Sequence, residues 1–76
     1  MTTKPLKNTL KVHRAMHDWT QAELSQRVDV TRKTINTVEN SRYVPSVFLA
    51  LKIARAFDVP VEELFQLDEE TPEDDT

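Results

Sequence analysis

The sequence predicts an all-α fold of five short helices, with one short C-terminal strand as the only β structure that the pattern allows. Apolar residues recur at helical spacing between residues 9 and 57, and a Ser, Thr or Asn residue stands before each segment. The 76 residues make a single small domain. The absence of cysteine excludes a disulfide framework and a thiolate metal site.

The first helix is predicted over residues 9–17, where Asn8 or Thr9 can act as the cap. Residues 1–7 before it are expected to form a loose N-terminal arm. The second helix, residues 21–27, begins at a capping box in which Thr20 and Glu23 can bond each other's backbone amides. Residues 28–31 then interrupt the helical pattern.

The third helix is predicted over residues 32–40, capped by Thr31. Its apolar residues Ile35 and Val38 point one way, and its polar residues point elsewhere. The fourth helix, residues 47–57, starts after Pro45-Ser46. Its spacing predicts a buried face with these members: Val47, Ala50, Leu51, Ala54 and Phe57.

A fifth helix over residues 61–65 follows the break at residues 58–60, and residues 65–67 can form the short strand. The domain therefore spans residues 8–67. Residues 68–76 contain no apolar residue and are predicted to be a disordered acidic tail. Such a tail either solubilises the domain or competes with DNA for a basic face.

The chain has no glycine, although turns between helices often need a residue with positive φ. Asn and Asp tolerate this conformation best after glycine. We therefore expect positive φ at Asp29, at Asn40 or Ser41, and at Asp58.

The charge is divided unevenly along the chain. Residues 1–57 hold all ten Lys and Arg residues and four acidic residues, which leaves a formal charge of +6. Residues 58–76 hold nine acidic residues and no basic residue, a charge of −9. The net charge of −3 thus conceals a basic domain that is suited to binding nucleic acid.

The strongest functional signal is the pair of short helices joined by about four residues. A helix of this length fits the major groove of DNA, where its first residues reach the base edges. Arg32 and Lys33 suit guanine, Asn36 suits adenine, and the methyl group of Thr34 can meet the phosphate backbone or a thymine methyl group.

Over residues 8–65 the sequence resembles the Cro/CI-like (XRE) helix-turn-helix regulators. The motifs that carry the resemblance are WTQAEL at residues 19–24, VTRKTIN at 30–36, VEN at 38–40, and PS at 45–46 with LALKIA at 49–54. The resemblance implies a five-helix lambda-repressor-like domain of the compact, stand-alone branch. Some members of that branch form homodimers through their C-terminal segment.

The resemblance also implies a role for individual residues. Gln21 would bond a phosphate, Asn40 and Arg42 would touch the DNA backbone, and Tyr43 would either stack on a sugar or cover the following loop. The residues expected to bind DNA are Gln21, Thr31, Arg32, Lys33, Thr34, Asn36, Thr37, Asn40, Arg42 and Tyr43. Arg14 and Glu39 are expected to form an ion pair between the first and third helices.

Four residues depart from the family's pattern. Asp29 and Ser41 stand where glycine is usual, His13 occupies a common apolar position, and Pro60 replaces the usual cap of the fifth helix. None of the four lies on the face expected to read DNA, so we expect them to affect turn geometry and stability.

A homodimer is expected because one such domain reads too few base pairs to find a unique site. An inverted repeat bound by two copies doubles the discrimination. The apolar residues Leu49, Ile53, Phe65 and Leu67 are interpreted either as core or as a two-fold interface.

Other classes of function have less support. No arrangement of catalytic residues is present, so an enzyme is not expected, and neither a cofactor nor a small-molecule ligand is implied. His13 and His17 have metal-ligand spacing but lack further ligands. No apolar run suits a membrane span, and a cytoplasmic protein is expected.

The main prediction is a sequence-specific transcriptional regulator, most simply a repressor. Two alternatives stay open: an antitoxin or phage-type regulator that acts with a partner protein, and a protein-interaction module that has lost DNA binding.

Overall fold

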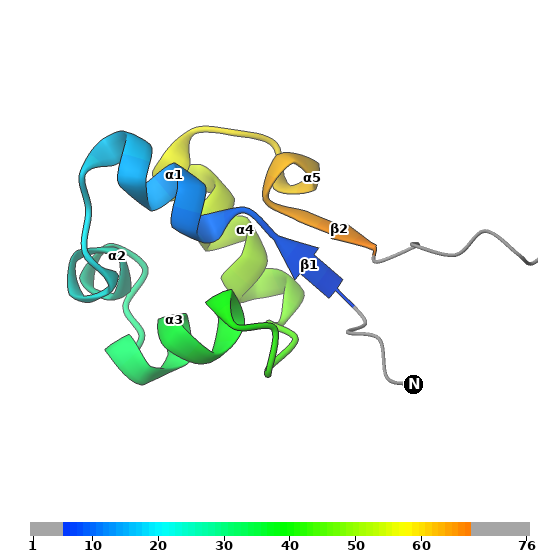
Figure 1. Ribbon diagram of the computed structural model, residues 1–76, viewed down its shortest axis with the longest axis horizontal. Coiled ribbons are helices and arrows are strands. Elements are labelled where there is room, and N and C mark those ends of the chain that lie inside the picture. The colour runs from blue at the N-terminus through cyan, green and yellow to red at the C-terminus, as the bar shows by residue number, and fades with distance from the viewer. Residues whose placement is uncertain (1–5, 68–76) are drawn as a thin grey trace, which may run out of the picture.

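The computed structural model describes residues 6–67, which form five helices and two short strands (Figure 1). In chain order the elements are β1 (Leu6–Asn8), α1 (Leu10–His17), α2 (Gln21–Arg27), α3 (Arg32–Glu39), α4 (Val47–Phe57), α5 (Val61–Leu64) and β2 (Phe65–Leu67). The predicted all-α class is confirmed, and each helix lies within one residue of its predicted bounds.

The two strands pair in antiparallel register, with Leu6 opposite Leu67 and Asn8 opposite Phe65. The predicted strand at residues 65–67 is therefore present. The prediction of a loose arm over residues 1–7 is wrong for residues 6 and 7, because their backbone bonds that of β2. Figure 1 shows how this pair joins the start and the end of the domain at one edge. The predicted disordered tail, residues 68–76, lies outside the described residues.

Side-chain caps fix where the helices begin. The capping box of α2 is complete: the Glu23 amide donates to Thr20 Oγ1 at 3.0 Å, and the Thr20 amide donates to Glu23 Oε1 at 3.1 Å. Thr31 and Ser46 cap α3 and α4 in the same way, because each hydroxyl group accepts a hydrogen bond from the backbone amide three residues later. At α1 the predicted cap Thr9 makes no cap bond, and Asn8 Oδ1 accepts from the Leu10 amide at 3.1 Å instead.

Within residues 6–67, four non-glycine residues with positive φ end the helices and turn the chain. Asp29 and Asp58 have φ of 60°, as expected, and Ser41 rather than Asn40 takes the third position with φ of 59°. Asp18 after α1 also has φ of 60°, which the sequence pattern did not single out. Asp side chains suit this region better than most non-glycine residues, and each turn is set by local backbone bonds.

The core lies among the five helices. The half-buried side chains of Trp19 and Phe65 pack against this core. The buried residues of the core are Leu10, Leu24, Val28, Ile35, Val38, Leu49, Ile53, Ala54, Phe57 and Leu64.

The predicted buried face of α4 is wrong for two of its members. Val47 is 75% exposed and Leu51 is 53% exposed, whereas Leu49 and Ile53 are buried. Because α4 is apolar around most of its circumference, its spacing fits two faces equally well. The face that carries Leu49, Ile53 and Phe57 is buried because α4 packs against both α2 and α5.

The same packing corrects half of the expected dimer interface. Leu49 and Ile53 belong to the core of the single chain, so they are not available to a second copy. Phe65 is half-buried against that core, and Leu67 is 66% exposed. The interpretation as core residues, rather than as a two-fold interface, therefore fits Leu49 and Ile53.

Candidate nucleic-acid interface

The helix-turn-helix unit consists of α2, the turn at residues 28–31, and α3. The turn is closed by backbone bonds from the Val30 amide to the Ser25 carbonyl at 3.0 Å and from the Asp29 amide to the Gln26 carbonyl at 3.4 Å. Ile35 and Val38 bury one side of α3, which fixes the opposite side as an exposed surface. Figure 1 shows α3 along the lower edge of the molecule with α2 beside its first turn.

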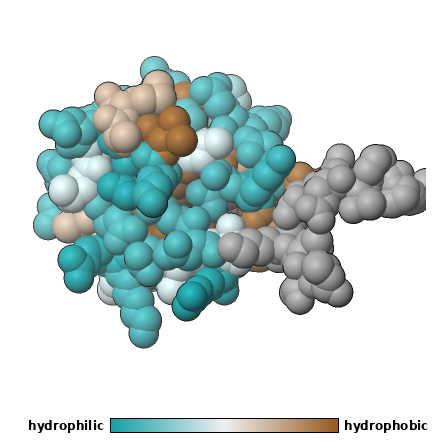
Figure 2. Space-filling view, viewed as in Figure 1, coloured by the Kyte–Doolittle hydropathy of each residue, from teal (hydrophilic) through white to brown (hydrophobic). Residues whose placement is uncertain are grey.

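The exposed side of α3 is polar and basic. Arg32, Lys33 and Asn36 are exposed, and Thr34 and Thr37 are partly exposed beside them. Figure 2 shows a predominantly hydrophilic surface where α3 lies. A polar surface of this kind suits base edges and phosphates better than an apolar protein partner.

Two hollows lie side by side on this surface, and Lys33 lines both of them. They gather nine of the ten residues that were predicted to bind DNA. One hollow is lined by Gln21, Arg32, Lys33 and Asn36, and the other by Thr31, Lys33, Thr34, Thr37, Arg42 and Tyr43. The tenth residue, Asn40, follows the last turn of α3, where its side-chain amide donates to the Asn36 carbonyl at 2.9 Å.

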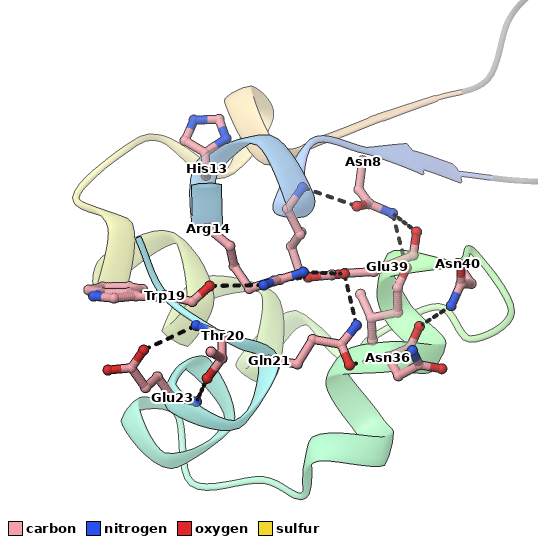
Figure 3. Close-up of polar contacts among 12 residues, drawn as sticks. Asn8, His13, Arg14, Trp19, Thr20, Gln21, Glu23, Asn36, Glu39 and Asn40 are labelled. Carbon is pink, nitrogen blue, oxygen red and sulfur yellow. Dashed lines mark hydrogen bonds and ion pairs between the residues drawn. The ribbon is translucent and has the colours of Figure 1, made fainter. Parts of the chain in front are cut away.

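The ion pair expected between Arg14 and Glu39 is present and largely buried (Figure 3). The Arg14 guanidinium donates through Nε and Nη2 to the two carboxylate oxygens of Glu39, and through Nη1 to the Trp19 carbonyl at 2.9 Å. Only 15% of the Arg14 side chain and 5% of the Glu39 side chain are exposed. The pair therefore ties α1 to the end of α3 and holds the exposed side of α3 in place.

Three further polar contacts of this region were missed by sequence reasoning. Asn8 Nδ2 donates to the Val38 carbonyl at 2.9 Å, which fastens β1 to α3. Gln21 Nε2 donates to Glu39 Oε1 at 3.0 Å, and Asn36 Nδ2 donates to Gln21 Oε1 at 3.4 Å (Figure 3). These partners are 15 to 30 residues apart in sequence, so no local pattern signals them.

The unusual His13 is a buried polar residue of α1. Its Nδ1 lies 3.0 Å from the Thr9 carbonyl oxygen, and its Nε2 lies 3.3 Å from Glu63 Oε2. The ring of His17 stacks on Trp19, with 4.6 Å between centroids, and both histidine rings also lie against Phe57, at 5.5 Å for His13 and 5.4 Å for His17. Within residues 6–67, no three His, Cys, Asp or Glu side chains gather as metal ligands would.

The other departures also have structural consequences. Asp29 and Ser41 adopt the left-handed conformation in place of glycine, and Pro60 starts α5 without a side-chain cap bond. Nothing among the described helices is both long enough and apolar enough to cross a membrane.

The sequence pattern of the helix-turn-helix family matches residues 10–64, from the start of α1 to the end of α5. The chain belongs to the XRE-type helix-turn-helix regulators. An HTH-type transcriptional regulator of Methanocaldococcus jannaschii is 45% identical to this regulator over 60 residues, which cover 79% of this chain and 91% of the relative. The HTH-type transcriptional regulator YgzD of Bacillus subtilis is 45% identical over 65 residues, 86% of this chain and 98% of the relative.

Solved structures agree with this XRE-type fold. A crystal structure of a protein from Bacteroides fragilis superposes with a TM-score of 0.72 at 23% identity, covering 80% of this chain and 98% of that one. The SOS-response transcriptional repressor LexA of Eubacterium rectale superposes with a TM-score of 0.70 at 19% identity, covering 88% and 71%. The helix-turn-helix regulator described here is thus a DNA-binding regulator of transcription.

Proposed function

We propose that this regulator is a repressor that binds an inverted-repeat operator as a homodimer, with α3 in the major groove. The observation that carries the proposal is the pair of hollows on the exposed side of α3, which unites nine of the ten residues expected to touch DNA. A helix that presents polar and basic side chains opposite a buried apolar side has the form that groove-reading helices need.

The contacts divide into those that read bases and those that position the protein. Arg32 and Lys33 face guanine, and Asn36 faces adenine, because these side chains match the hydrogen-bonding edges of those bases. The hydroxyl and methyl groups of Thr34 and Thr37 lie close to the backbone or to thymine methyl groups. The contacts that position the protein come from Gln21, Thr31, Asn40, Arg42 and Tyr43, which bind phosphates and sugars.

The charge distribution supports this orientation. The acidic residues Glu62 and Glu63 belong to α5, and Figure 1 shows α5 on the far side of the molecule from α3. These two carboxylates therefore lie away from the reading surface and do not repel the DNA phosphates. The protein would act in the cytoplasm, where it meets the DNA.

The second copy is proposed to pack on the exposed apolar side of α4 and the loop before it. Val44, Val47, Phe48 and Leu51 are between 53% and 75% exposed, within eight residues of one another. Clustered exposed apolar side chains of this kind mark interaction surfaces. Binding to an inverted repeat would require a dimer formed here to leave both α3 helices on the same side, about 34 Å apart on DNA.

Selection from a random duplex library at near-physiological salt, followed by sequencing, tests the proposal. Enrichment of an inverted repeat, with half-sites about one helical turn apart, is the expected result. Recovery of a single half-site would contradict the homodimer, and recovery of no motif would contradict sequence-specific binding. A reporter gene that carries the selected repeat over its promoter then distinguishes repression from activation.

A further inference from the structure

A continuous chain of polar side chains runs from the buried ion pair to the exposed side of α3 (Figure 3). Arg14 donates to Glu39, Gln21 donates to Glu39 at 3.0 Å, and Asn36 donates to Gln21 at 3.4 Å. The chain begins at a carboxylate that is 5% exposed and ends at an exposed amide. A buried carboxylate is thus linked by hydrogen bonds to a side chain on the surface proposed to face DNA.

The direction of every bond in this chain is set by Glu39. A carboxylate only accepts hydrogen bonds, so Gln21 must turn its amino group toward Glu39. The carbonyl oxygen of Gln21 then points the other way, and it accepts only from a donor. Asn36 must therefore turn its amino group toward Gln21, as the structure has it.

This leaves Asn36 with a defined pair of groups for a base. Its Nδ2 has a second N–H, and its Oδ1 accepts no hydrogen bond from any residue in the range 6–67. Adenine offers an N6 donor and an N7 acceptor in the major groove, which match one acceptor and one donor. Guanine offers two acceptors there, O6 and N7, and would leave Oδ1 facing an acceptor.

We propose that Glu39 is a positioning residue for base recognition, which orients Asn36 through Gln21 so that Asn36 selects adenine over guanine. This inference rests on the proposed function and assigns part of its specificity. Glu39 touches no base itself. It acts by fixing which end of the Gln21 and Asn36 side-chain amides donates and which accepts. This role is separate from its ion pair with Arg14.

The variant Glu39→Gln tests the polarity directly. The side-chain amide introduced at position 39 has one carbonyl oxygen, which accepts from the Arg14 guanidinium. Its amino group therefore faces Gln21. Gln21 must then turn its carbonyl oxygen inward, and Asn36 must turn its amino group outward. Asn36 would present donors to the groove, and the preference at its base pair shifts from adenine toward guanine.

The measurement is library selection and sequencing with the full chain, followed by affinities for two duplexes that differ only at one position. Asn36→Ala identifies that position, because its preference disappears in this variant. The wild-type protein is expected to favour adenine over guanine by about 5- to 150-fold. In Glu39→Gln the ratio of the two affinities is expected to fall to one or to reverse.

Two matched variants separate orientation from stability. Gln21→Leu interrupts the chain but leaves the ion pair, and it is expected to abolish the preference for adenine. Arg14→Lys weakens the ion pair but leaves the carboxylate facing Gln21, and it is expected to keep the preference. If Glu39→Gln does not fold, as judged by circular dichroism, the Gln21→Leu result decides.

An unchanged adenine preference in folded Glu39→Gln or in Gln21→Leu overturns the inference. So does a wild-type motif in which Asn36→Ala alters no position, although DNA binding itself would then stand. If the wild-type protein enriches no motif, the proposed function fails and the inference fails with it.

Discussion

At the scale of single residues, the carboxylate of Glu39 is the more deeply buried partner of its ion pair with Arg14. Three N–H groups, two from Arg14 and one from Gln21, reach its carboxylate from two other helices. A buried carboxylate is tolerated only when its partners remain, because desolvation penalises an unpaired charge. The stability of the domain should therefore depend strongly on the guanidinium of Arg14.

Replacement Arg14→Ala is expected to lower the free energy of unfolding by about 3–5 kcal/mol, since it leaves Glu39 buried without its cation. Urea denaturation followed by circular dichroism measures the change. Lys11→Ala on the same helix is the control, because Lys11 is exposed and its loss should cost less than about 0.5 kcal/mol. Similar losses in the two variants would show that burial of the pair adds nothing.

Arg32 and Arg42 are both exposed, yet they should differ in what they recognise. Arg32→Ala is expected to weaken binding of the selected site by about 1–3 kcal/mol and to relax its sequence preference. Arg42→Ala should weaken all sequences alike and reduce the slope of log affinity against log salt by about 1. Titrations of specific and random duplexes at several salt concentrations measure both, and identical behaviour of the two variants would contradict the assignment.

The exposure of the residues expected to face DNA was predictable, and the family resemblance also implied the Arg14–Glu39 pair that supports them. Most of the other supporting contacts were not predictable. Arg32 and Lys33 stand at the start of a capped helix, and that local pattern is enough to expose them. Asn8 contacts Val38 across 30 residues, and His13 contacts Glu63 across 50. Contacts of this range depend on how the helices pack, which no spacing along the chain specifies.

At the scale of elements, helix starts are set locally and are correspondingly robust. Thr20→Ala removes the acceptor of the Glu23 amide and is expected to cost about 1 kcal/mol of stability. Thr20→Ser keeps the hydroxyl group and should lose much less. Thermal melting of both variants makes the comparison, and a Ser variant as unstable as the Ala variant would mean that the methyl group of Thr20 matters instead.

The helix bounds were predictable because caps and positive-φ residues are local signals. The buried side of α4 was not, because a helix that is apolar on most sides gives no unique direction. Packing against α2 and α5 decides it, and those contacts exist only in the folded chain. The β1 strand escaped prediction for the same reason, since its partner lies at the other end of the domain.

At the scale of the whole molecule, the exposed side of α4 is expected to hold two copies together. Phe48→Glu places a charge in that surface and should convert the dimer to a folded monomer that binds a half-site far more weakly than wild type binds the repeat. Met16→Glu on α1 is a matched control, because Met16 and Phe48 are each 71% exposed. Sedimentation equilibrium measures the assembly, and dissociation by both variants or by neither would contradict the proposed surface.

The pairing of β1 with β2 brings residues 6 and 67 directly opposite each other. Residues that face each other in such a pair lie only about 5 Å apart, so the backbone leaves and returns at nearly the same point. The domain can therefore be grafted into a surface loop of a host protein without spreading the loop open. By the same geometry, a short peptide linking residues 67 and 6 would permit new ends to be cut elsewhere, for example between α3 and α4. A force that pulls residues 6 and 67 apart would break the hydrogen bonds between β1 and β2 one after another, beginning at that end.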